Sequence, residues 1–111
     1  MESYLSGYRI MWILVMFDLP TVTKEEQKRA NEFRNSLLEL GFQMTQYSVY
    51  IRACAGQEKM RVYSKYIEEA LPQQGNVQIF CITDRQYSSS LHFIGKKKQK
   101  ITKTEQLLLF E

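Results

Sequence analysis

The stretch of sequence that decides the fold runs from Ile10 to Pro20 and reads IMWILVMFDLP. Residues 10–17 are apolar throughout and rich in strand formers, and Pro20 ends the strand because proline cannot donate to a ladder. A strand with one wet face alternates polar and apolar residues, so this strand predicts a sheet covered on both faces. In so small a domain, helices cover one face and the other requires a second subunit. The sequence therefore predicts a dimer.

A helix is predicted after this strand. Thr23 can cap it, and Glu26, three residues further on, completes a capping box. Gly41 supplies the C-terminal stop. The apolar residues of this helix recur at helical spacing and are Ala30, Phe33, Leu37 and Leu40.

The rest of the chain predicts further strands and one more helix. Residues 43–53 favour a strand but exceed the usual length of about 5–6 residues, so we expect a bend near Ser48. A further strand is predicted over residues 77–84, and short strands over 91–94 and 107–110. The last of these is expected to dock as an edge strand on its own sheet or a partner's, since it would otherwise expose an apolar tail. The second helix ends before Pro72 and has an apolar face formed by Met60, Tyr63, Ile67 and Leu71.

The order strand, helix, two strands, helix, strand predicts an α+β fold, a ferredoxin-like βαββαβ sandwich with two helices on one face of an antiparallel sheet. We expect a single domain over residues 1–111, with a core over about 10–84 and extra C-terminal strands in an extension over about 85–111. An RNA-recognition motif shares this strand order, but its aromatic signature is absent.

Composition excludes several functional classes. The 15 basic and 12 acidic residues give a net charge of +3, too small to identify a nucleic-acid-binding domain. Cys54 and Cys81 lie in apolar runs and His92 is the only histidine, so we expect buried, reduced thiols and no zinc site. Residues 1–9 do not resemble a signal peptide, and the apolar run that follows is well short of the about 20 residues of a membrane helix. We therefore expect a cytoplasmic protein with no membrane partner.

Asp18 is the candidate catalytic and metal-binding residue. It ends the first strand, where the chain leaves the sheet, so its carboxylate is expected to be accessible to solvent. Two Asp18 carboxylates brought together at a dimer axis would suit Mg²⁺, which takes oxygen ligands and keeps several waters, over a scissile phosphate. The alternative is an aspartate that caps the turn before the helix. Asp84 is expected at the far end of the sheet, and His92 is expected to be a packed residue.

Basic residues offer diffuse contacts to a phosphate backbone. Contacts of this kind position nucleic acid without reading its sequence. A solvated basic surface explains any single one of them equally well, including the lysine-rich stretch that begins at Lys96. Four tyrosines, at positions 47, 50, 63 and 66, could stack bases, although their spacing suits core packing better. The candidate contacts are Arg9, Lys24, Lys28, Arg29, Arg34, Arg52, Lys96, Lys97 and Lys98.

Four segments resemble CRISPR-associated protein two. Residues 13–20, ILVMFDLP, resemble its opening strand, which ends in an aspartate, and residues 33–42, FRNSLLELGF, resemble its first helix. Residues 46–50, QYSVY, are similar to its Gln-x-Ser-Val-aromatic block, and residues 75–77, GNV, introduce the next strand as in that family. The order and spacing of these segments make the resemblance specific. The chain resembles in particular the members found beside the large single-chain effector nuclease of type II systems.

The resemblance implies a homodimer that bridges two dimers of the CRISPR integrase, CRISPR-associated protein one, and binds double-stranded protospacer DNA for spacer acquisition. The integrase performs the strand transfer in that assembly. Members are also described as metal-dependent endonucleases on RNA or DNA, which implies Asp18 as a Mg²⁺ ligand and leaves open whether this chain acts as an enzyme. Residues 107–110 resemble the C-terminal strand that pairs with the partner subunit in relatives. Residues 21–24, TVTK, stand where some relatives carry an arginine-rich loop.

Overall fold

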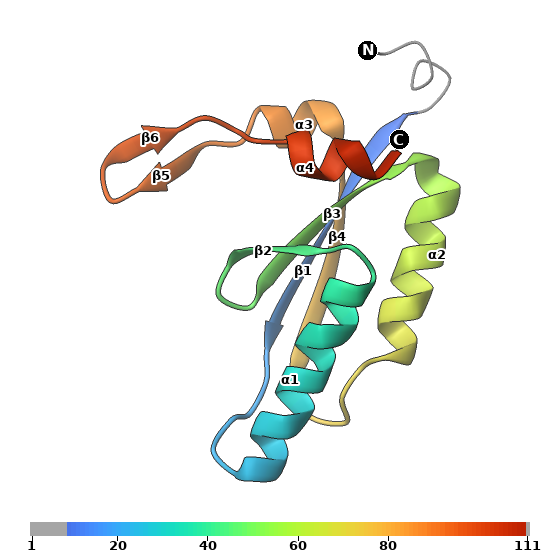
Figure 1. Ribbon diagram of the computed structural model, residues 1–111, viewed down its shortest axis with the longest axis vertical. Coiled ribbons are helices and arrows are strands. Elements are labelled where there is room, and N and C mark those ends of the chain that lie inside the picture. The colour runs from blue at the N-terminus through green and yellow to red at the C-terminus, as the bar shows by residue number, and fades with distance from the viewer. Residues whose placement is uncertain (1–8, 111) are drawn as a thin grey trace.

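The computed structural model describes residues 9–110, so residues 1–8 and 111, which the predicted domain boundaries include, lie outside the described range. Four antiparallel strands form the central sheet in the order β2-β3-β1-β4, and the two long helices lie on one face of it (Figure 1). This arrangement confirms the predicted ferredoxin-like α+β fold. The elements are β1 (Ile10–Asp18), α1 (Lys24–Glu39), β2 (Gln43–Gln46), β3 (Val49–Ala55), α2 (Gly56–Glu69), β4 (Asn76–Thr83), α3 (Asp84–Ser88), β5 (His92–Ile94), β6 (Lys97–Gln99), α4 (Thr104–Leu107) and the 3-10 helix η1 (Leu108–Phe110).

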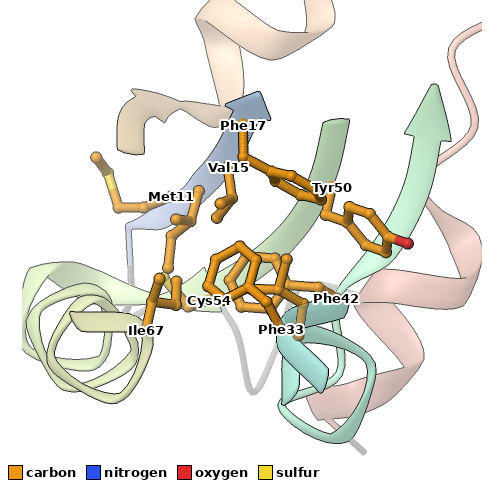
Figure 2. Packing of buried hydrophobic residues seen from close by; sticks show 10 residues of the cluster. Met11, Val15, Phe17, Phe33, Phe42, Tyr50, Cys54 and Ile67 are labelled. Carbon is orange, nitrogen blue, oxygen red and sulfur yellow. The ribbon is translucent and has the colours of Figure 1, made fainter. Parts of the chain in front are cut away.

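The helix-covered face of the sheet holds the main hydrophobic core (Figure 2). Alternate side chains of β1 point into it, because successive residues of a strand face opposite sides. Ile13 and Val15 are completely buried there, in one cluster with Leu37 of α1 and Ile67 of α2. These contacts confirm the predicted apolar faces of the two helices, except that Leu71 lies beyond the end of α2 and is 42% exposed.

The opposite face of β1 is covered over only part of its length. Trp12 is completely buried and stacks on Tyr87 of α3, with 4.1 Å between the ring centroids, and Ile101 packs against the same cluster. Further along this face, Met16 is 39% exposed and Phe80 of β4 is 47% exposed. The prediction that this face needs a second subunit is therefore wrong for its Trp12 half, because the chain's own C-terminal extension covers that half.

The boundaries of α1 and the bend between β2 and β3 follow the predicted signals. The Thr23 hydroxyl accepts a hydrogen bond from the Glu26 N–H, and the Glu26 carboxylate accepts one from the Thr23 N–H, which completes the capping box. Gly41 adopts φ of 87° just after the helix, a conformation that glycine tolerates without strain. The predicted bend is confirmed at Ser48, whose φ is 63°.

The segment after α2 departs from the prediction at one boundary. β4 ends at Thr83, and Asp84 begins α3 instead of ending the strand. The reason is a second capping box, in which the Thr83 hydroxyl accepts from the Gln86 N–H and the Gln86 side chain accepts from the Thr83 N–H. The short strand predicted at residues 91–94 is confirmed as β5, and it pairs with β6 in a hairpin that projects from the body (Figure 1).

The predicted strand at residues 107–110 is wrong, since this segment forms the end of α4 and the 3-10 helix η1. Gln106, which is only 3% exposed, explains why. Its side-chain oxygen accepts from the Ala53 N–H at 2.9 Å, and its side-chain nitrogen donates to the Gly41 carbonyl at 3.1 Å. The Gln106 side chain thus satisfies the Ala53 N–H and the Gly41 carbonyl, which a docked edge strand would otherwise have bonded with its backbone.

The two cysteines differ in environment. Cys54 is buried as predicted, and burial raises the pKa of its thiol to about 11. Cys81 is exposed, contrary to the prediction, because it lies on β4 at the edge of the sheet. As for membrane association, no helix within residues 9–110 is long and apolar enough to cross a bilayer.

Candidate metal and nucleic-acid site

Asp18 lies at the last position of β1, opposite Asn76 at the start of β4. Its side chain is exposed, as predicted. The turn before β4 approaches the end of β1 closely at Gly75, which has φ of 97°. A Cβ at Gly75 would lie 2.8 Å from the Asp18 carbonyl oxygen and 2.7 Å from a methyl carbon of Leu19, so only glycine fits this position.

Asp18 belongs to the face of the sheet that the helices leave uncovered. The β1–β4 register places Met16 opposite Gln78 and Asp18 opposite Asn76, and paired residues of antiparallel strands share a face. Together with Phe17, these four residues line an open depression of about 380 Å³. The carboxylate therefore stands at the end of the partly apolar face that contains Met16 and Phe80.

The donors around Asp18 suit a hydrated divalent cation but do not form a closed cage. The depression offers one carboxylate, from Asp18, and the side-chain amides of Asn76 and Gln78. Within residues 9–110, no three acidic, histidine or cysteine side chains come together as a metal cluster. Mg²⁺ is commonly held by one or two carboxylates and keeps several waters, so one chain provides half of the carboxylate pair predicted from the sequence.

The alternative role predicted for Asp18, a cap for the turn before α1, stays a prediction, because other residues cap the N-terminus of the helix itself. The cap is Thr23, and the Glu26 carboxylate also accepts a hydrogen bond from the Val22 N–H at 3.0 Å. The acidic residues of the first turn, Glu25 and Glu26, thus serve the helix, as predicted.

An aromatic side chain that the sequence assigned to the core lies instead on the surface near this end of the sheet. Tyr47 is 75% exposed in the turn between β2 and β3, and the Phe17 N–H donates to the next carbonyl, that of Ser48, at 3.1 Å. Arg34 of α1 donates to the Tyr47 hydroxyl at 3.1 Å and lies 5.1 Å from the centroid of its ring. The turn at Ser48 is the sequence signal that places Tyr47 outside the core. Tyr50, in contrast, is buried as predicted.

The structure separates the predicted nucleic-acid contacts on its surface into two groups, whereas Arg52, also predicted as a contact, is buried on β3 beneath the helices. Lys24, Lys28 and Arg34 lie on α1, which begins shortly after Asp18. Arg9 lies at the other end of β1, where its carbonyl accepts from the Gly56 N–H at 2.8 Å. Residues 96–98 belong to the projecting hairpin, whose base also lies toward that end (Figure 1). No single basic patch therefore unites all the predicted contacts.

Asp84 and His92 have structural partners. Asp84 lies at the far end of the sheet from Asp18, as predicted, where it accepts from Trp12 Nε1 at 2.8 Å and from Lys103 Nζ at 3.0 Å. His92 contacts the Ser90 hydroxyl at 3.0 Å and meets the Tyr87 ring edge-on. The expectation of a packed histidine is therefore confirmed.

Comparison with known proteins agrees with this architecture. The family described as "CRISPR associated protein Cas2" matches residues 11–90, which include the whole βαββαβ unit except its first residue. The chain belongs to the Cas2 family. A protein from Paracidovorax avenae named "CRISPR-associated endoribonuclease Cas2" is 50% identical over 89% of this chain and 92% of its own length. Proteins of the same name from Flavobacterium psychrophilum and Parvibaculum lavamentivorans are 48% and 46% identical, over 96% and 90% of this chain and 93% and 100% of their own lengths.

The Cas2 match ends inside the C-terminal extension. Residues 91–110, which contain the projecting hairpin, α4 and η1, lie beyond the matched range. The relatives from P. avenae and F. psychrophilum nevertheless align with most of the chain. The Cas2 match therefore covers the central sheet, the two long helices and Asp18, and it leaves the hairpin and the C-terminal helices outside.

Proposed function

We propose that this Cas2 chain is a CRISPR adaptation subunit, which dimerises, bridges dimers of the integrase CRISPR-associated protein one, and binds the backbone of protospacer DNA for spacer acquisition. The observation that carries this proposal is the part of the sheet face left uncovered between the Trp12 cluster and Asp18. The membership in a CRISPR-associated family supports the same role.

The uncovered part of the sheet favours a second copy of the chain as its partner. Leu14 is half-buried, and its neighbours Met16 and Phe80 are 39% and 47% exposed on the same face. β4 is an outer strand of the described sheet, so the backbone groups along its outer edge can pair with another chain. It also carries apolar residues on both of its faces. A second copy that packs here would bury both features and would bring a second Asp18 toward the first.

The basic residues of α1 and of the hairpin support contacts to a phosphate backbone. Lys24 and Lys28 are exposed on the first two turns of α1. The hairpin exposes three more lysines, Lys96, Lys97 and Lys98. A dimer doubles both groups and spreads them over a longer surface than one chain offers. Such contacts hold a duplex without reading its sequence, as a spacer-capturing protein requires.

Light scattering during size-exclusion chromatography tests this proposal, with the chain alone and then with the integrase and a short DNA duplex. We expect a dimer, which enters a larger complex when both partners are present. Phosphate contacts further predict that DNA binding weakens steeply as salt concentration rises. A monomer that does not associate with the integrase would contradict the proposal.

A second candidate function is Mg²⁺-dependent cleavage of RNA or DNA through paired Asp18 residues. The observation that favours it is the exposed Asp18 carboxylate beside the amides of Asn76 and Gln78, at the end of the face where a second copy would pack. In two copies, the Asp18 pair would hold the ion and the amides would orient its waters. A bound Mg²⁺ would supply a polarised water and offset charge on the phosphate.

Replacement of Asp18 by asparagine separates the two candidates. Asparagine keeps the size of the side chain and removes its charge, so the dimer and its complex with the integrase are expected to persist. If the chain is a nuclease, cleavage of a labelled RNA or DNA in Mg²⁺ is expected to fall by at least about 100-fold, and chelation of the metal should have the same effect on the unaltered protein. Undiminished cleavage by the Asp18→Asn variant would rule out this mechanism.

A further inference from the structure

The hairpin of β5 and β6 projects from the body of the protein and has both of its faces open to water (Figure 1). Its outer part consists of two pairs of opposed residues, Phe93 with Lys98 and Ile94 with Lys97. Opposed residues of antiparallel strands share a face, so each face combines an apolar side chain with a lysine. Phe93 is 54% exposed and Ile94 is 73% exposed. A two-stranded hairpin with no covered face is marginally stable in water, which favours a partner that surrounds it.

The hairpin belongs to a strongly basic segment of the chain. Between Asp84 and Glu105 there is no acidic residue, and the six basic residues there are Arg85, Lys96, Lys97, Lys98, Lys100 and Lys103. Among residues 9–110, the only ion pair that involves one of these six joins Lys103 to Asp84. The four lysines from 96 to 100 are exposed and uncompensated. This charge favours a polyanion as the partner.

The polar side chains of the hairpin that could read the edges of bases are already bonded within the chain. Gln99 donates to the Lys97 carbonyl at 3.1 Å, and His92 contacts the Ser90 hydroxyl at 3.0 Å. The side chains left for a partner are therefore lysines and apolar residues. Lysines suit phosphate oxygens, and apolar side chains suit the uncharged surface between two rows of phosphates.

We propose that the β5–β6 hairpin is an arm that enters the major groove of a DNA duplex. The proposal rests on the DNA binding proposed above and names the segment and the groove that take part. The major groove is about 12 Å wide and admits a two-stranded β-ribbon. Lys97 and Lys98, on opposite faces of the hairpin, then reach the phosphates on the two walls of the groove, while Phe93 and Ile94 contact the base edges and the thymine methyl groups. A groove covers both faces of the hairpin at once, whereas a flat protein surface covers only one.

The salt dependence of DNA binding tests the lysine contacts. A labelled DNA duplex is titrated with the chain at several salt concentrations, and binding is followed by fluorescence anisotropy. Replacing Lys97 and Lys98 together by glutamine should lower the slope of log affinity against log salt concentration by about 2, since each phosphate contact contributes about 0.9. The matched control replaces Lys59 and Lys65, which are exposed on α2, and should keep the slope. An unchanged slope in the hairpin variant would overturn the proposal.

A comparison of DNA with RNA tests the groove itself. The major groove of an RNA duplex is deep and narrow and does not admit the hairpin, although the duplex carries the same charge per nucleotide. Phe93→Ala should weaken binding to the DNA duplex by about 10-fold, because the ring is no longer covered on binding, and should leave binding to an RNA duplex of equal length unchanged. Tyr66→Ala removes an exposed ring from α2 and is the matched control, expected to leave both affinities unchanged. An equal loss on both duplexes with Phe93→Ala would overturn insertion into the groove.

The outcomes separate this proposal from the proposed function. If the unaltered chain binds the duplex and both hairpin variants bind it equally well, the arm is refuted and the adaptation role stands. If the unaltered chain does not bind the duplex, both proposals fail. A hairpin variant that binds DNA normally but no longer enters the integrase complex in light scattering would assign the hairpin to an acidic protein surface, and would also refute the arm.

Discussion

Replacement of Gln106 by leucine tests whether one side chain fastens the C-terminal segment to the sheet. Gln106 is 3% exposed, and its amide bonds to the Ala53 N–H at 2.9 Å and to the Gly41 carbonyl at 3.1 Å. Leucine fills a similar volume but offers neither an acceptor nor a donor. Ala53 has no exposed surface, so its N–H would lose its acceptor in a place that water does not reach.

The size of the effect follows from these two backbone groups. A buried N–H without a partner costs about 1–3 kcal/mol. The Gly41 carbonyl is only half-buried and can accept a hydrogen bond from water instead, so it adds little to this cost. We therefore expect a loss of about 2 kcal/mol in the free energy of unfolding, a large share of the roughly 5–15 kcal/mol of a typical domain. The urea midpoint should fall by about 1 M.

Trp12 provides the signal for this assay, because it is the only tryptophan and is completely buried against Tyr87. Equilibrium unfolding in urea is followed by its fluorescence. Gln73→Leu is the matched control, since Gln73 is exposed and the same change there should alter stability by less than about 0.5 kcal/mol. If Gln106→Leu unfolds at the same urea concentration as the unaltered protein, Gln106 does not fasten α4 to β3.

Three further predictions concern the dimer, the first helix and the buried thiol. Phe80→Asp should convert the dimer to a folded monomer, seen by light scattering, because Phe80 is 47% exposed on the uncovered face; a persistent dimer would place the interface elsewhere. Thr23→Ala should lower the free energy of unfolding by about 1 kcal/mol, measured in urea, because the Glu26 N–H loses its acceptor; an unchanged midpoint would contradict the capping box. Burial raises the Cys54 pKa from 9.0 to about 11, so the unfolded chain loses this proton first and the stability due to the neutral thiol falls as pH rises from 9 to 11. If the urea midpoint falls equally between pH 9 and 11 in a Cys54→Ala variant, another group is responsible. A thiol reagent at about pH 8 should modify the exposed Cys81 before the buried Cys54.

Much of the fold could be predicted because its signals are local. The apolar run before Asp18 indicates a central strand, the pair Thr23 and Glu26 fixes the start of α1, and Gly41 fixes its end. These features depend on residues that are close together in the sequence, and the local backbone brings their side chains together whatever the rest of the fold does. The exposed position of Asp18 could be predicted for the same reason, since Pro20 forces the strand to end just before it, at Asp18.

The C-terminal extension could not be predicted because its conformation depends on distant partners. Residues 107–110 have the composition of a strand, but Gln106 bonds to Ala53 and Gly41, which lie 53 and 65 positions earlier in the chain. Asp84 begins α3 because of the local capping box of Thr83 and Gln86, but its carboxylate accepts from Trp12 and Lys103, which lie 72 and 19 positions away in the chain. No pattern within a short window contains these pairings.

The sequence by itself determined the βαββαβ order, the two helix faces and the place of Asp18, because periodicity and caps act over a few residues. Only the tertiary structure decided which half of the second sheet face the chain covers for itself. It also decided that Arg52 is buried without an acidic partner among residues 9–110, while Tyr47 is exposed. Burial and charge compensation depend on which segments meet in space, and that is settled by packing over the whole chain.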